Sequence, residues 1–137
     1  MNVISNAGQT EMVVVGMEPG EMLLESIEQA VADENIRNGV VVSGIGTLKN
    51  LHMHYITHTN FPSDNEFINI ERPLELVSVS GIIADGEAHL HVSVSCGRDE
   101  VYCGHLEAGC EVAYLAEVAI LKCNDLAMVR RPDEKRK

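Results

Sequence analysis

The chain has 137 residues, of which 45% are hydrophobic and 4% aromatic, and its formal net charge is −11. This length fits one domain with a substantial core. The body, residues 1–129, holds five basic against 19 acidic residues, a formal charge of −14, and 130–137 holds the other five basic residues. A body so acidic repels a phosphate backbone, which argues against DNA binding. We expect residues 130–137 to form a basic, disordered tail behind a single domain over 1–129.

The cysteines and the apolar segments bear on the compartment. Four cysteines are present without a C-x-x-C pair, at positions 96, 103, 110 and 123. The N-terminus lacks the basic and apolar regions of a signal peptide, and no apolar run approaches the length of a membrane span. We therefore expect a cytoplasmic protein with free thiols and no membrane partner.

Apolar periodicity predicts the first elements. Residues 12–16 are rich in valine and predict a short strand. Apolar residues recur at helical spacing over 21–35, with acidic residues between them, which predicts an amphipathic helix packed on a sheet. Asn38-Gly39 is expected to stop this helix. Residues 40–47 predict a buried strand that runs into a glycine-containing bend.

The remaining chain predicts a series of strands joined by short turns. They cover 66–70, 74–84, 87–96, 101–103, 110–123 and 126–129. Asp85-Gly86 is a hairpin-type turn, so the strands on either side of it are expected to be antiparallel neighbours. The predicted fold class is α+β, a mostly antiparallel sheet with one main helix packed on it.

The strand over 87–96 carries the strongest chemical signal. Leu90, Val92 and Val94 point to one face of an extended chain, while His89 and His91 share the other. A hairpin after Cys96 would return His105 to the same place. Neutral imidazole is a common ligand of zinc, and three protein ligands with one open position are typical of catalytic zinc. His89, His91 and His105 are therefore predicted to hold Zn²⁺ or another divalent transition metal.

A second histidine doublet is a rival for this site. His52 and His54 also alternate along an extended segment, with His58 further on, and spacing alone does not exclude them as ligands. The alternative is an exposed strand that leads into a polar loop.

Glu117 is the candidate for an acid, a base or a group that orients a metal ligand. It interrupts a largely apolar strand over 110–123, so we expect it to be buried. A buried carboxylate needs a cation, a metal or strong hydrogen-bond donors. The alternative is a structural glutamate bonded to the backbone or to an arginine.

Five short motifs occur in an order that resembles the PPC domain, also called domain of unknown function 296, over roughly residues 10–129. They are Gly44-Ile45-Gly46-Thr47, Glu75-Leu76-Val77-Ser78-Val79-Ser80-Gly81, His89-Leu90-His91-Val92-Ser93, Gly104-His105-Leu106 with Gly109, and Ala116-Glu117-Val118. The resemblance implies a strongly bent sheet and a homotrimer. It also implies a fold similar to acetolactate decarboxylase, in which the positions of His89, His91 and His105 hold zinc.

Two functions follow from these observations. The first is a zinc-dependent lyase or hydrolase that acts on a small oxygen-rich molecule, with Glu117 moving a proton. The second is a non-catalytic, oligomeric regulatory or ligand-binding module. The resemblance implies DNA binding as well, because plant members carry AT-hooks, but this chain lacks the Arg-Gly-Arg-Pro core and is acidic.

Overall fold

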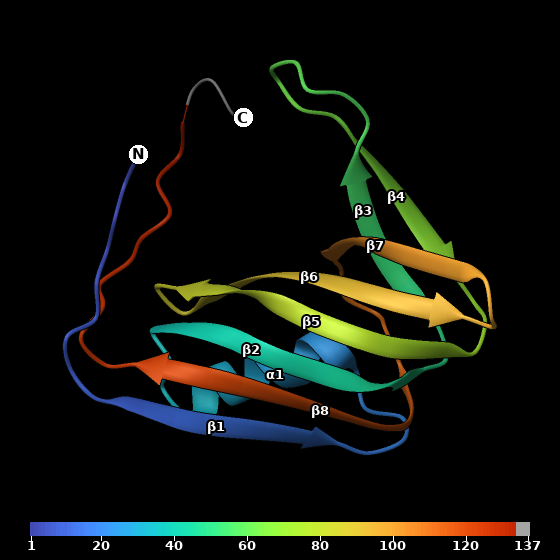
Figure 1. Ribbon diagram of the computed structural model, residues 1–137, viewed down its shortest axis with the longest axis horizontal. Coiled ribbons are helices and arrows are strands. Elements are labelled where there is room, and N and C mark those ends of the chain that lie inside the picture. Colours follow the sequence, from blue (N-terminus) through green and yellow to red (C-terminus); the bar gives the residue numbers. More distant parts are fainter. Residues whose placement is uncertain (134–137) are drawn as a thin grey trace.

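The protein is described by a computed structural model over residues 1–133. It contains one helix and a single eight-stranded sheet, in which every neighbouring pair of strands is antiparallel (Figure 1). The elements are β1 (Thr10–Met17), α1 (Leu23–Asp33), β2 (Asn38–Leu48), β3 (Leu51–Ile56), β4 (Asn65–Ile70), β5 (Leu74–Ala84), β6 (Glu87–Cys96), β7 (Glu100–Leu106) and β8 (Val112–Cys123). The strand order is β1-β8-β2-β5-β6-β7-β3-β4. The predicted α+β class is confirmed.

The sheet bends sharply between β7 and β3. Only two residue pairs join these strands, Met53 with Leu106 and His54 with His105. Beyond them the β3–β4 hairpin rises away from the rest of the sheet (Figure 1). At this bend a short stretch of β3 still pairs with β7, and this stretch contains His54.

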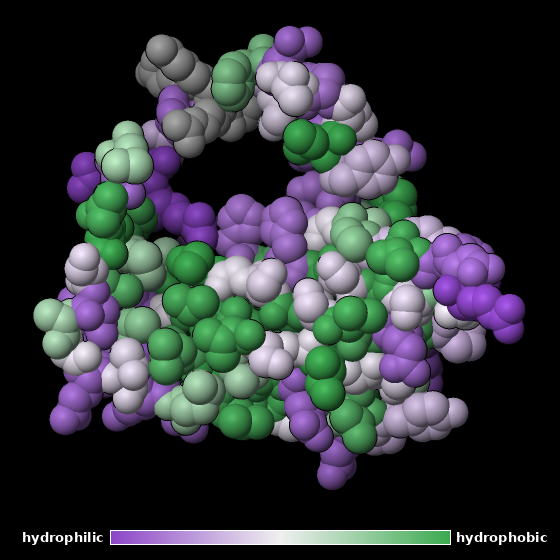
Figure 2. Space-filling view, viewed as in Figure 1, coloured by the Kyte–Doolittle hydropathy of each residue, from purple (hydrophilic) through white to green (hydrophobic). Residues whose placement is uncertain are grey.

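The core lies between α1 and one face of the sheet. Leu23, Ile27 and Val31 recur every four residues on the helix and are buried, as the amphipathic pattern predicts. The strands contribute alternate residues, and those of β6 are Leu90, Val92 and Val94. The face of the sheet opposite α1 is open, and Figure 2 shows apolar side chains gathered on it. The exposed apolar residues of β1, β2, β5 and β8 include Val14, Val42, Ile45, Val77, Ile82 and Leu115.

Turn chemistry explains the β5–β6 hairpin. Asp85 and Gly86 both have positive φ angles, 52° and 78°. This is the backbone that a two-residue type I′ turn requires. The prediction that β5 and β6 are antiparallel neighbours is confirmed.

Two predictions about local structure are wrong. The helix ends at Asp33, and Asn35 takes the left-handed conformation (φ 51°), so Asn38 and Gly39 already belong to β2. Residues 126–129 form no strand. The buried Asn38 replaces strand pairing there, because its side chain donates to the carbonyl oxygen of Leu126 and accepts from the amide of Met128 (2.7 and 2.8 Å).

The predicted basic tail is only partly described. Residues 130–133 are exposed and have no regular structure, and 134–137 lie outside the described residues. Within the described part of the chain, no helix has the length and hydropathy needed to cross a membrane.

Candidate metal centre

A row of polar and aromatic side chains crosses five neighbouring strands on the open face of the sheet. His91 on β6 pairs directly with His105 on β7, and His105 pairs with His54 on β3. Ser80 on β5 and Phe67 on β4 end the row. His89 lies two residues before His91, on the same face. Direct pairing of strands therefore assembles the histidines, and no loop has to place them.

The geometry fits one metal ion. One nitrogen from each of His89, His91 and His105 can be chosen so that the three lie within 4.8 Å of one another. Zinc–nitrogen bonds are about 2.1 Å, so nitrogens around one tetrahedral ion lie about 3.4 Å apart, and the three side chains would draw closer together to share it. The ring centroids of His89 and His105 are 4.8 Å apart, and His91 lies 5.5 Å from each of them. The residues predicted as ligands are thus brought together.

Close approach of β5 to β6 supports this arrangement. Gly81 has a φ angle of +152°, and a Cβ atom there would lie 2.0 Å from the carbonyl oxygen of His89. Only glycine fits this position without moving the backbone of His89.

Burial and neighbouring cations favour neutral imidazoles. Partial burial lowers the pKa of His89, and the positive charge of Arg130 lowers it further. Partial burial also lowers the pKa of His105, with His54 and His89 adding to the effect. A metal binds the neutral ring, so these shifts suit the ligand role.

The second histidine doublet divides between two environments. His54 joins the row, and its ring stacks on His105 with centroids 4.3 Å apart. The His52 ring packs near Gly109, and His58 lies in the exposed β3–β4 loop, where it accepts from the amide of Asn60. Among the described residues, neither His52 nor His58 belongs to a group of potential metal ligands.

Glu107 is a residue that our sequence interpretation missed. Its carboxylate contacts Nδ1 of His54, and it forms a second group of potential ligands with His54 and His105. It follows His105 by two residues at the end of β7, so alternation could have placed it on the histidine face.

The expectation that Glu117 is buried is wrong. Its side chain is exposed on the open face, where its strand partners are Gly16 on β1 and Ile45 on β2. Strands β2 and β5 separate β8 from β6, so Glu117 does not reach the histidines of its own chain. Apolar residues lie on both faces of β8 because the open face is itself apolar, and this misled the prediction.

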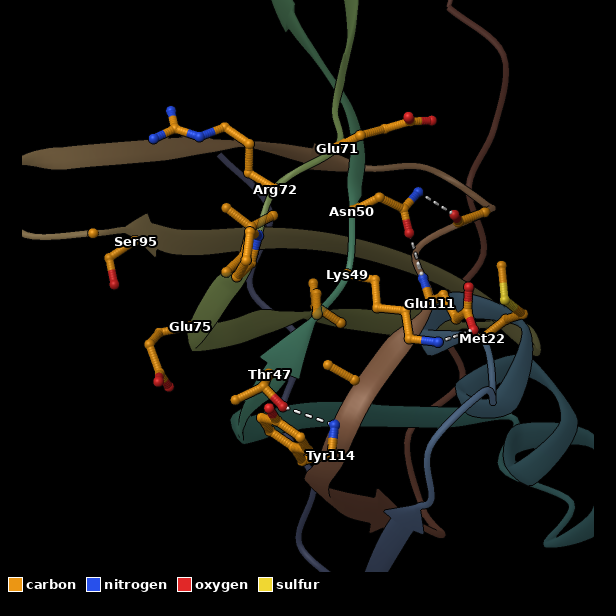
Figure 3. Close-up of a pocket in the computed structure, with 16 residues that line it drawn as sticks. Met22, Thr47, Lys49, Asn50, Glu71, Arg72, Glu75, Ser95, Glu111 and Tyr114 are labelled. Carbon is orange, nitrogen blue, oxygen red and sulfur yellow. Dashed lines mark hydrogen bonds and ion pairs between the residues drawn. The ribbon is translucent and has the colours of Figure 1, made fainter.

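A cavity lies away from the histidines, near the ends of β2, β5 and β8 (Figure 3). Its volume is about 920 Å³, and its lining includes Thr47, Lys49, Arg72, Glu75, Glu111 and Tyr114. Lys49 pairs with Glu111 (2.8 Å), and Arg72 pairs with Glu100 (2.8 Å). Its two basic side chains therefore already have acidic partners.

The fold is of the α+β class, with a histidine cluster on the open face of its antiparallel sheet. Residues 4–124 match the model of the Plants and Prokaryotes Conserved (PCC) domain, also written PPC. The chain belongs to this family, as the sequence motifs predicted.

The chain is also similar to solved structures and to part of a curated protein. A metal-containing protein from Archaeoglobus fulgidus is 26% identical, with a TM-score of 0.81 and coverage of 98% of this chain and 94% of that one. A plant- and prokaryote-conserved protein from Pyrococcus horikoshii is 29% identical, with a TM-score of 0.78 and coverage of 98% and 92%. The bifunctional protein GlmU of a Synechococcus strain is 25% identical over 126 residues, 92% of this chain, which spans only 19% of that relative's length.

Proposed function

We propose that this protein binds one divalent transition-metal ion through His89, His91 and His105 and presents it to a small oxygen-rich molecule. The observation that carries the proposal is the convergence of three imidazole nitrogens within 4.8 Å on directly paired strands. Zinc is the metal that three imidazoles with one open position suit best. The similarity to a metal-containing archaeal protein supports the same reading.

The ion would supply Lewis-acid chemistry or lower the pKa of bound water. His89 and His91 are exposed, so a ligand can approach the ion from solvent. Lyase or hydrolase chemistry on a carbonyl, carboxylate or ester oxygen fits such a centre.

We further propose that copies of the chain associate through the open face, as a homotrimer. The exposed apolar residues of β1, β2, β5 and β8 would then be covered, together with Glu117, which lies among them. Single-domain surfaces rarely carry so extended an apolar face without a partner. A neighbouring copy is also the route by which Glu117 could reach a histidine centre and move a proton there.

A metal titration tests the centre. We expect the metal-stripped protein to bind Zn²⁺, in competition with a chromophoric chelator, and each of His89→Ala, His91→Ala and His105→Ala to weaken binding at least ~100-fold. His58→Ala is the matched control, because it removes an exposed histidine outside the row. Equal affinity of wild type and the three ligand variants would refute the centre.

The cavity near Lys49 and Arg72 favours the second candidate, a non-catalytic ligand-binding module. Its volume of about 920 Å³ is typical of small-molecule sites. The two candidates differ in what a bound small molecule does. A metal-dependent enzyme converts it, and conversion stops in His91→Ala, whereas a binding module releases it unchanged and keeps its affinity in that variant.

A further inference from the structure

His54 and Glu107 form a tightly held pair next to the three-histidine centre. The His54 ring lies between two other rings, with centroids 4.3 Å from His105 and 4.9 Å from Phe67. Its Nδ1 contacts Oε1 of Glu107. The side chains of His54 and Glu107 are only 19% and 33% exposed. Two ring contacts and the contact with Glu107 thus orient the His54 side chain toward His105.

The backbone brings this pair to His105. A Cβ atom on Gly104 would lie 2.7 Å from the carbonyl oxygen of His54, so a larger residue would push β3 away from β7. The amide of Glu107 donates to the carbonyl oxygen of His52 (3.1 Å), which holds the end of β7 against β3. These two features hold the backbone at the end of β7 against β3, beside His54.

Among residues 1–133, His54 is the basic residue that forms an ion pair with Glu107. Within the described part of the chain, none of the ion pairs made by lysine or arginine includes Glu107. A half-buried carboxylate between two imidazoles is a favourable place for a divalent cation.

We propose that His54, His105 and Glu107 form a second cation site, which shares His105 with the three-histidine centre and rests on the function proposed for that residue. One ligand atom from each of the three residues lies within 4.8 Å of the other two. Two imidazoles and a carboxylate bind Zn²⁺, Mn²⁺ and Fe²⁺.

The protons balance in a simple way. The proton shared by His54 Nδ1 and Glu107 leaves to solvent when the cation takes both atoms. His105 has two ring nitrogens, so it can serve both ions by releasing its remaining N–H proton. Because the two ions then share one imidazole, the second ion binds more weakly than the first.

Metal stoichiometry tests the proposal. Metal-free protein is dialysed against Zn²⁺ at increasing free concentration, and bound metal per chain is measured by elemental analysis. We expect two ions in the wild type and in His58→Ala, and one ion in Glu107→Gln and in His54→Gln. The double variant His89→Ala/His91→Ala removes two ligands of the first centre and should retain one ion, at the second site.

Glu107→Gln keeps the size and the hydrogen-bonding capacity of the side chain, and circular dichroism establishes that each variant is folded. One ion in the wild type, bound with unchanged affinity in Glu107→Gln and His54→Gln and lost in the double variant, would overturn the second site and leave the proposed centre intact. Two ions in the wild type that both persist in Glu107→Gln and His54→Gln would also overturn it. Failure of the proposed centre has a different signature, namely no loss of metal in His89→Ala/His91→Ala.

Discussion

His91 and His105 are direct partners across β6 and β7, and His105 is at the same time the direct partner of His54 across β7 and β3. One imidazole thus has a histidine neighbour on each side within a single sheet. The central position of His105 makes it the residue on which both proposed cation sites depend. Its replacement should affect metal binding more than the replacement of any other histidine.

Gly81 is predicted to be essential for the position of His89. Gly81→Ala would place a Cβ atom 2.0 Å from the His89 carbonyl oxygen, at a φ angle of +152° that alanine rarely adopts. We expect a loss of roughly 1–3 kcal/mol in the free energy of unfolding and at least tenfold weaker Zn²⁺ binding. Chemical denaturation and the chelator competition measure the two effects.

Gly16→Ala is the matched control for this change. Gly16 also lies in a strand, but no atom is within 4 Å of the position that its Cβ would take. Its unfolding free energy should change by less than ~0.5 kcal/mol. If the two alanine variants behave alike, close approach of β5 to β6 is not what positions His89.

The pKa shifts of His89 and His105 predict how the stability of the metal-free protein depends on pH. Burial lowers the pKa of both imidazoles in the folded state, so below pH 6.5 the unfolded chain binds protons more readily than the folded chain. The two histidines therefore lower the free energy of unfolding as the pH falls from 6.5 toward their lowered pKa values. Well above pH 6.5 neither state binds these protons, and the effect vanishes.

Denaturant unfolding at pH 7.5 and 5.5 measures this loss, and NMR titration of the ring protons gives the pKa values directly. His89→Gln removes one of the two shifted groups, so its stability should fall less between these pH values than that of the wild type. An equal fall in both proteins would show that His89 is not a source of the pH dependence.

The four cysteines should differ sharply in reactivity. Cys103 is exposed, whereas Cys96, Cys110 and Cys123 are buried. Burial raises the pKa of the Cys110 thiol to about 11, so at pH 8 only about one molecule in a thousand carries the thiolate there. We expect Ellman's reagent to modify one thiol rapidly in the native protein and four in denaturant. Rapid labelling that survives in Cys103→Ser would contradict this assignment.

Duplex DNA should bind weakly or not at all. The formal charge of −14 on residues 1–129 opposes a phosphate backbone, and only residues 130–137 are rich in basic side chains. Fluorescence anisotropy at ~150 mM salt should give a dissociation constant above ~100 µM, weaker than common non-specific binding. Sub-micromolar affinity with a steep dependence on salt would contradict the charge argument.

Sequence patterns predicted those parts of the fold in which a strand pairs with its neighbour in the sequence. The β5–β6–β7 meander followed from alternation and turn residues, because each strand pairs with its neighbour in the sequence. The proposed three-histidine centre lies within that meander, so the three residues that the structure brings together could be selected from the sequence.

The features that were missed depend on pairings between distant segments. β3 pairs with β7 at the bend of the sheet, and no local sequence pattern encodes that pairing. The proximity of His54 to His105 and Glu107 was therefore not predicted. Residues 126–129 are apolar enough for a strand, but both edges of β8 are already occupied by β1 and β2. Glu117 was predicted to be buried because its neighbours along β8 are apolar, although the face of the sheet on which it lies is exposed in the single chain.

The alternation of β6 couples the metal centre to the core. Leu90 and Val92 pack beneath the same strand whose other face carries His89 and His91, so a shift of the strand by one residue would exchange histidines for core residues. The ion proposed between β6 and β7 would bind only one of these registers. Zn²⁺ at 100 times its dissociation constant would therefore add about 2.7 kcal/mol to the stability of the native register. Metal binding would then favour this register of β6 over a shifted one.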